Sequence, residues 1–236
     1  MSLEIPDIPP ELNKVFRTGL LKQILALRGL DANELSLFEW FEREQEALIE
    51  KMLQEEKEEI QKQYDSGRED VNDSGMVAVE YFVKRSRYSH VIFIASLLET
   101  YLDESCQDLT RALGEQNIPF RLEELTGEKW AKRKKYLERY GQFQIPEEIW
   151  SPVSAISLIR NLLIHENGNC AGLREKQKRE FRQIPGISVE SYEMVIEPLV
   201  VKDALKALRN LVEFLDAKLK GVIESAIKFQ SAGKKG

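Results

Sequence analysis

The sequence has little cysteine and little histidine. Its 236 residues include only 2 Cys and 2 His. Cys106 and Cys170 are far apart, and neither has a second Cys or His beside it at the spacing of zinc ligands. The sequence therefore suggests neither a disulfide framework nor a zinc site, and we expect no metal and no cofactor. Reduced cysteines also favour a cytoplasmic setting.

Long hydrophobic runs and a basic charge balance are absent as well. No apolar run approaches the roughly 18 residues that cross a bilayer. The N-terminus, Met1-Ser2-Leu3-Glu4-Ile5-Pro6, lacks the basic-then-apolar order of a signal peptide. The formal net charge is −6, which argues against a surface coated with cations for duplex DNA. We therefore expect no membrane and no DNA partner, with any contact to nucleic acid confined to local patches.

The sequence is rich in helical periodicity. Apolar residues recur three or four apart from Asp31 to about Tyr64 among many Glu, Lys and Gln residues, which predicts one long amphipathic helix. Turn-forming residues follow, and we place a domain boundary near Ser74. This divides the chain into an N-terminal helical annex, 1–74, and a main helical domain, 75–236, which is large enough to bury a core without disulfides.

The main domain is predicted to contain further helices and short strands. A helix with a dense apolar centre runs from about Met76 to Leu113, and another runs from about Val200 to Phe229. Partial alternation between Ile187 and Ile196 is compatible with short strands. The predicted fold class is therefore all-α: a helical bundle with an N-terminal helical annex and a short β-hairpin before the C-terminal helix.

The helix from about Pro152 to Glu166 has the best-marked ends. Ser151 suits the N-cap and Pro152 suits the first helical position. Asn167-Gly168-Asn169 can adopt the left-handed conformation that closes a helix. On a helical wheel its apolar residues surround nearly the whole circumference, so we expect burial on most sides. These apolar residues are Val153, Ile156, Leu158, Ile159, Leu162, Leu163 and Ile164.

Arg160, Asn161 and His165 form a polar arc on this helix, within roughly 140° of its circumference. Polar groups in an apolar wall are costly unless they are paired, so we expect the arc to face a cleft or another chain. A purely structural hydrogen-bonding role is the alternative. Arg85 and His90 have the same spacing, but they resemble the solvated start of a buried helix, and we do not expect them to form the active site.

The run Arg160-Asn161-Leu162-Leu163-Ile164-His165 near a helix end resembles the signature of the HEPN superfamily of helical ribonucleases and nucleotide-binding proteins. The resemblance extends to an earlier apolar helix with an embedded acid, Glu99, and to Asn167-Gly168 after the His. It covers about Met76 to Phe229. In one toxin-like branch a Tyr stands two places after the His and is modified by a partner nucleotidyltransferase. Asn167 occupies that place here, so we do not expect this regulation.

The resemblance implies metal-independent cleavage of RNA by a homodimer, through attack of a ribose 2′-hydroxyl on its own phosphate. This reaction needs proton transfer, which an imidazole can provide, and a cation to stabilise the phosphorane. His165 and Arg160 are the candidates, and Asn161 would orient the imidazole or contact substrate. Glu99 would anchor Arg160 or the neighbouring chain, although an ordinary polar stripe is the alternative for Glu99. Asn167 is a supporting candidate.

Two basic segments, from Lys129 to Tyr136 and from Arg174 to Arg182, are candidate RNA-binding surfaces. Cations neutralise phosphates and aromatic rings stack on unpaired bases, whereas a solvated helix face is the alternative. The cations predicted to contact RNA are Lys132, Arg133, Lys134, Lys135, Arg174, Lys176, Lys178 and Arg179.

Two other functions are compatible with the sequence. The chain could keep the fold and the dimer but only bind RNA, a nucleotide or a protein. It could also be a helical scaffold whose first long helix pairs with another helix. A toxin with a protein antitoxin, an antiviral defence protein and an RNA-processing enzyme are all compatible biological roles.

Overall fold

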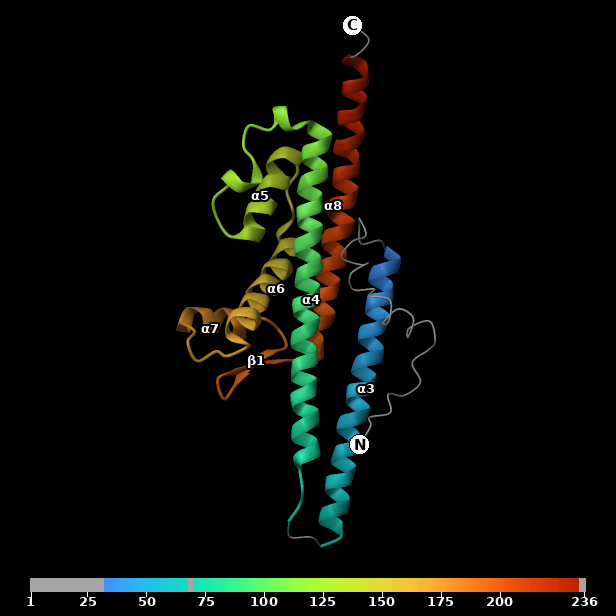
Figure 1. Ribbon diagram of the computed structural model, residues 1–236, viewed down its shortest axis with the longest axis vertical. Helices are drawn as coiled ribbons and strands as arrows, with labels where there is room; N and C mark the ends of the chain where they lie inside the picture. Colours follow the sequence, from blue (N-terminus) through green and yellow to red (C-terminus); the bar gives the residue numbers. More distant parts are fainter. Residues whose placement is uncertain (1–31, 68–69, 234–236) are drawn as a thin grey trace.

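The computed structural model describes residues 32–67 and 70–233 (Figure 1). This part of the chain is mostly helical, with a two-stranded antiparallel hairpin before the last helix, which confirms the predicted fold class. None of the helices in these ranges combines the length and the apolar character that crossing a membrane requires.

Long helices form the frame of the molecule. They are α3 (Ala32–Asp65), α4 (Ser74–Leu113) and α8 (Pro198–Gly233), and their ends differ from the predicted ones by a few residues. Figure 1 shows α4 lying along α8, with α3 beside both on the opposite side from the shorter elements. The frame therefore gives the shorter elements a continuous surface on α4 and α8.

The shorter elements pack on one side of this frame (Figure 1). The hairpin pairs Ile187 with Ile196 and brings Met194 into the core, which confirms the predicted short strands. The elements are two 3₁₀ turns (Glu115–Asn117 and Leu122–Glu124), α5 (Lys129–Gly141), α6 (Glu147–Glu166), α7 (Glu175–Arg182), β1 (Ile187–Glu190) and β2 (Glu193–Ile196).

The main hydrophobic core lies where α4, α6 and α8 meet. Leu98 of α4, Ile159 of α6, and Leu208 and Leu211 of α8 are all almost completely buried there. Burial of each such side chain stabilises the fold by about 1.5–3 kcal/mol. Phe181 joins the same core from α7, so the segment that follows α6 is anchored as well. The core thereby fixes the position and rotation of α6.

The described part of the annex, α3, packs against the main domain. Leu35 joins the main core, and Ile49 forms a smaller apolar cluster with Val79 and Val83 of α4. Ion pairs of Glu46 with Arg87 and of Glu39 with Arg209 flank these contacts. α4 begins at Ser74, where the boundary was predicted, but the division into 1–74 and 75–236 stays a prediction. Residues 1–31 of the annex lie outside the described residues.

The predicted start of α6 is wrong. The helix begins at Glu147, and Pro152 lies inside it instead of at its first position. Pro146 is the residue before the helix and has an extended conformation, while Glu147 and Glu148 place negative charge in the first turn. This charge interacts favourably with the helix dipole. Trp150 is buried in the core. Its packing lets the helix begin more than one turn before Pro152.

Candidate functional site

α6 presents one face to the core and an open face to solvent. Its buried residues include Ile156, Ile159, Leu162 and Leu163. On the other face Asn161 and His165 are exposed, Arg160 is half-buried, and the apolar side chain of Ile164 is 44% exposed. The expectation of burial on most sides is therefore wrong for the single chain, because α4 and α8 together cover only one side of the helix. The polar arc lies on the open face.

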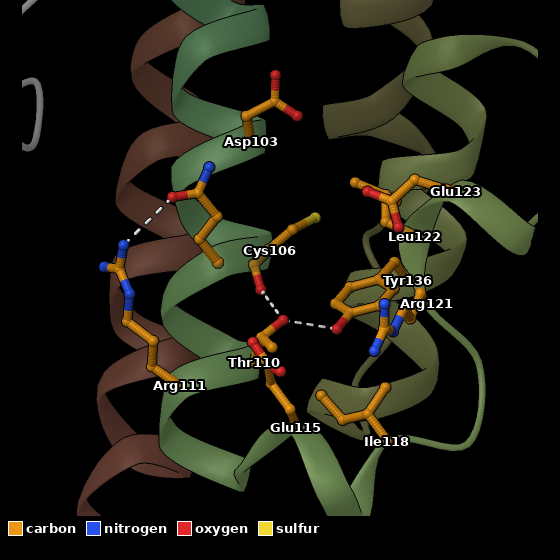
Figure 2. Close-up of a pocket in the computed structure, with 11 residues that line it drawn as sticks. Asp103, Cys106, Thr110, Arg111, Glu115, Ile118, Arg121, Leu122, Glu123 and Tyr136 are labelled. Atoms are coloured by element: carbon orange, nitrogen blue, oxygen red, sulfur yellow. Dashed lines mark hydrogen bonds between the residues drawn. The ribbon is translucent and has the colours of Figure 1, made fainter.

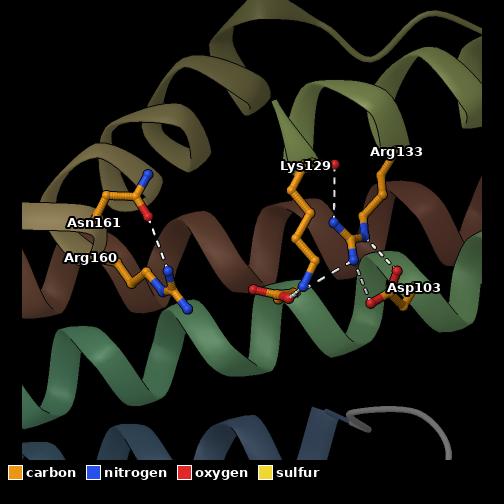
Figure 3. Close-up of polar contacts among 6 residues, drawn as sticks. Asp103, Lys129, Arg133, Arg160 and Asn161 are labelled. Atoms are coloured by element: carbon orange, nitrogen blue, oxygen red, sulfur yellow. Dashed lines mark hydrogen bonds and ion pairs between the residues drawn. The ribbon is translucent and has the colours of Figure 1, made fainter. Parts of the chain in front are cut away.

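Arg160 and Asn161 contact each other at the edge of this face. The Arg160 Nη1 group donates a hydrogen bond of 3.1 Å to Oδ1 of Asn161. Figure 3 shows the Arg160 side chain directed from α6 toward α4. No carboxylate of the described residues lies within ion-pair distance of Arg160. Most of its hydrogen-bond donors are therefore open to a ligand.

The end of α6 has the predicted left-handed cap. Asn167 adopts φ 52° and ψ 32°, and Gly168 has φ 80°. Both values lie in the region that Gly and Asn tolerate best, which explains why these residue types end the helix. The Gly168 N–H donates to the Leu162 carbonyl at 3.3 Å. The cap fixes the conformation of the last helical turn, which carries His165.

α4 contributes an arginine to this end of α6. The Arg85 Nη1 group donates a hydrogen bond to Oδ1 of Asn167, and the guanidinium lies 5.1 Å from the ring centre of Tyr81. Its buried Nε has no hydrogen-bond partner within the described residues. Sequence reasoning missed this contact because the two residues are 82 positions apart and no local pattern links them. The ion pair of Lys84 with Glu193 ties the same part of α4 to the hairpin.

His90, the other histidine, faces a different helix. Its Nδ1 lies 2.9 Å from Oε1 of Glu42 in α3, and the two side chains are 12% and 7% exposed. The expectation of a solvated helix start is therefore wrong for His90, whereas Arg85 is partly exposed. The structure separates the two residues. Arg85 lies at the C-terminal end of α6, whereas His90 lies in the α3–α4 interface.

Glu99, the predicted anchor of Arg160, contacts α5 instead. Its Oε1 atom forms an ion pair with Lys129 and lies 3.9 Å from Nη2 of Arg133. Arg133 is buried and makes two hydrogen bonds to the Asp103 carboxylate, at 2.5 and 2.6 Å (Figure 3). Arg133 also donates to the Lys129 carbonyl at 3.0 Å. This network fastens the start of α5 to α4.

The cations predicted to contact RNA differ in their exposure to solvent and in their ion pairing. Arg133 is buried against Asp103 and is therefore not free to meet a phosphate in this conformation. Lys134 is 19% exposed and lies between the carboxylates of Glu138 and Glu147. On α7, Lys178 is paired with Glu175 at 3.0 Å. The cations that remain half-exposed or exposed are Lys132, Lys135, Arg174, Lys176 and Arg179.

A cavity of about 700 Å³ lies apart from the polar arc, between α4, the 3₁₀ turns and α5 (Figure 2). Thr110 and Tyr136 are joined by a 2.6 Å hydrogen bond at its wall, and Arg121 and Glu123 lie on the same side of it as Tyr136. Burial raises the pKa of Cys106, another lining residue, to about 12. The motif residues do not line this cavity.

Comparisons with protein-family models, with curated proteins and with solved structures found no match to this chain. In the described part of the chain, no three or more His, Cys, Asp and Glu side chains are grouped so that they could hold a metal ion.

Proposed function

We propose that this chain is a metal-independent endoribonuclease of the HEPN type, in which Arg160 and His165 act on the RNA backbone. The observation that carries the proposal is that Arg160, Asn161 and His165 share the open face of α6, while Arg160 has no carboxylate partner among the described residues. A guanidinium without an acid partner keeps its planar set of donors for phosphate oxygens.

The chemistry divides between the side chains of His165 and Arg160. The imidazole of His165 takes the proton of a ribose 2′-hydroxyl, which then attacks its own phosphate. The guanidinium of Arg160 stabilises the negative charge of the phosphorane. The bond to the 5′-oxygen breaks as that oxygen takes a proton from the imidazolium of His165, which regenerates the neutral imidazole. The products are a 2′,3′-cyclic phosphate and a 5′-hydroxyl. Asn161 fixes the orientation of the guanidinium through its 3.1 Å hydrogen bond.

A homodimer is part of the proposal. Ile164 is 44% exposed between the polar residues of α6, so a contact that covers this face would bury its apolar surface together with the polar arc. A two-fold contact would pair this face with itself and bring two copies of the arc together. We expect light scattering at micromolar concentration to show a dimer. An active monomer would contradict this part of the proposal.

Alanine variants of the two histidines test the assignment. We expect His165→Ala to lower the rate of RNA cleavage by about 10²–10⁴-fold, because a positioned proton-transfer group is lost. His90→Ala is the matched control, since His90 contacts α3 and not the motif. Thermal melting must show that both variants are folded. The assay uses purified protein, mixed RNA and excess EDTA.

Each outcome of this assay has a defined meaning. A folded and dimeric His165→Ala variant that is as active as wild type would refute the assignment to this motif. If His90→Ala were the inactive variant, the choice between the two histidines would be wrong. Activity that returns only on addition of a metal would refute metal independence. Wild-type protein that binds RNA without cutting it would favour a catalytically inactive binding module.

The scaffold alternative predicts a different result. The inner side of α3 is already covered by α4 and α8 of the same chain, so among the described residues only its outer side is open to another helix. If the chain is a scaffold protein, wild type and His165→Ala should give the same result in every RNA assay and should bind the same protein partner. Parallel RNA assays on wild-type and His165→Ala protein therefore separate a scaffold from an enzyme.

A further inference from the structure

A cation on the neighbouring helix α5 extends toward α4, as Arg160 of the polar arc does (Figure 3). Figure 3 shows Lys129, at the start of α5, and Arg160, on α6, both directed toward α4. Burial, and then the positive charges of Arg133 and Arg160, lower the pKa of Lys129. Glu99 and Asp103 are the carboxylates that pair with this group, so three cations are balanced by two anions. The group therefore has an excess positive charge.

Lys129 and Arg133 have different roles in this group. The Arg133 side chain is 5% exposed and fully engaged by Asp103, so it holds α5 on α4. The Lys129 side chain is 64% exposed, and its ion pair with Glu99 lies at the surface. Such exposed pairs contribute little to stability. The ammonium group of Lys129 is therefore able to leave Glu99 for another anion without loss of the α4–α5 contact that Arg133 holds.

The position of Lys129 is also unfavourable for a lysine in the absence of an anion. It is the first residue of α5, where the helix dipole presents partial positive charge. Cations destabilise this end of a helix and anions stabilise it. Without Glu99, Lys129 would experience repulsion from Arg133, from Arg160 and from its own helix, and a phosphate in place of Glu99 would offset this repulsion.

We propose that Lys129 is a positioning residue that binds an RNA phosphate adjacent to the one held by Arg160. This inference rests on the proposed function and adds a residue from α5 to the site on α6. In the free protein Glu99 holds the Lys129 ammonium beside the arc, and the RNA phosphate replaces Glu99 as its partner. The site therefore takes single-stranded RNA along a line from the arc toward the start of α5.

Substitutions of the two partners distinguish this role from a structural one. Lys129→Ala should weaken RNA binding about 3- to 10-fold and reduce the dependence of log Kd on log salt by about one. Glu99→Gln should bind RNA as tightly as wild type or more tightly, because the competing acid is gone. If the ion pair served only the fold, both variants would weaken binding and lower the melting temperature together.

Binding and cleavage are measured separately. Fluorescence anisotropy with a labelled single-stranded RNA, 2′-O-methylated at every position so that it cannot be cut, gives Kd at several KCl concentrations. A labelled unmodified RNA gives kcat and KM, and Lys129→Ala is expected to raise KM with little change in kcat. The control is Lys51→Ala on α3, because Lys51 is similarly exposed and also paired with a glutamate, Glu55.

The two proposals fail differently. Wild-type protein that binds the methylated RNA but cuts no RNA would refute the proposed ribonuclease, while the binding arm would still decide the role of Lys129. Equal Kd and equal salt dependence for wild type and Lys129→Ala would overturn the inference, whether or not the wild type cuts RNA. An equal loss in Lys51→Ala, or no binding by wild type, would overturn it as well.

Discussion

Gly168 is the point at which α4, α6 and the hairpin meet. Its carbonyl accepts a hydrogen bond of 2.8 Å from Met194, and its φ of 80° lies in the left-handed region. A Cβ atom at this position would lie 2.5 Å from Oη of Tyr88 and 2.7 and 2.8 Å from two of its ring carbons. The same Tyr88 hydroxyl donates to the Met194 carbonyl. Gly168→Ala should therefore disturb the backbone, the packing and a hydrogen bond together.

The expected loss of stability for Gly168→Ala is about 3 kcal/mol. An L-residue in the left-handed conformation costs about 1 kcal/mol. Overpacking against a buried ring costs about 1–3 kcal/mol more. For a chain of 236 residues, each kcal/mol lowers the melting temperature by about 2–4 °C. We therefore expect the melting temperature to fall by about 6–12 °C.

Gly172→Ala is the matched control for this measurement. A Cβ at Gly172 would have no heavy atom within 4 Å, and its φ is not in the left-handed region. Circular dichroism melts should show Gly172→Ala within about 2 °C of wild type. RNA cleavage by Gly168→Ala should also fall at temperatures where it is folded, because the cap holds the turn of His165. A Gly168→Ala melting temperature equal to that of Gly172→Ala would refute the packing argument.

Two further predictions concern buried side chains where α4 and α5 meet. Arg133→Ala should lower the free energy of unfolding by about 2–4 kcal/mol in urea titrations, because Asp103 loses a bidentate partner and a buried stem is removed. A loss no larger than that of the exposed Arg139→Ala would contradict this. Burial raises the pKa of Cys106 from 9.0 to about 12, so its thiolate fraction at pH 8 falls about 10³-fold. Iodoacetamide should modify Cys106 only after unfolding, and rapid labelling of folded protein would show the thiol to be accessible.

The lengths and types of the main elements were predictable from the sequence. Apolar periodicity acts between residues three or four apart, so the pattern along α4 and α8 indicates these helices without knowledge of their neighbours. The cap at Asn167 and Gly168 was equally local, because the left-handed conformation depends on the residue itself. The start of α6 was not predictable, since Pro146 and Pro152 both suit a helix start and the burial of Trp150 favours the earlier one.

The surroundings of the polar arc were decided only by the tertiary structure. The sequence shows that Arg160, Asn161 and His165 share one face of a helix. It does not show which face α4 and α8 leave open. Arg85 reaches the end of α6 from 82 residues away. Lys129 and Arg133 belong to one basic run, yet one is exposed and the other is buried against Asp103. Local patterns determine which side chains share a helix face, whereas burial and pairing depend on the packing of distant helices.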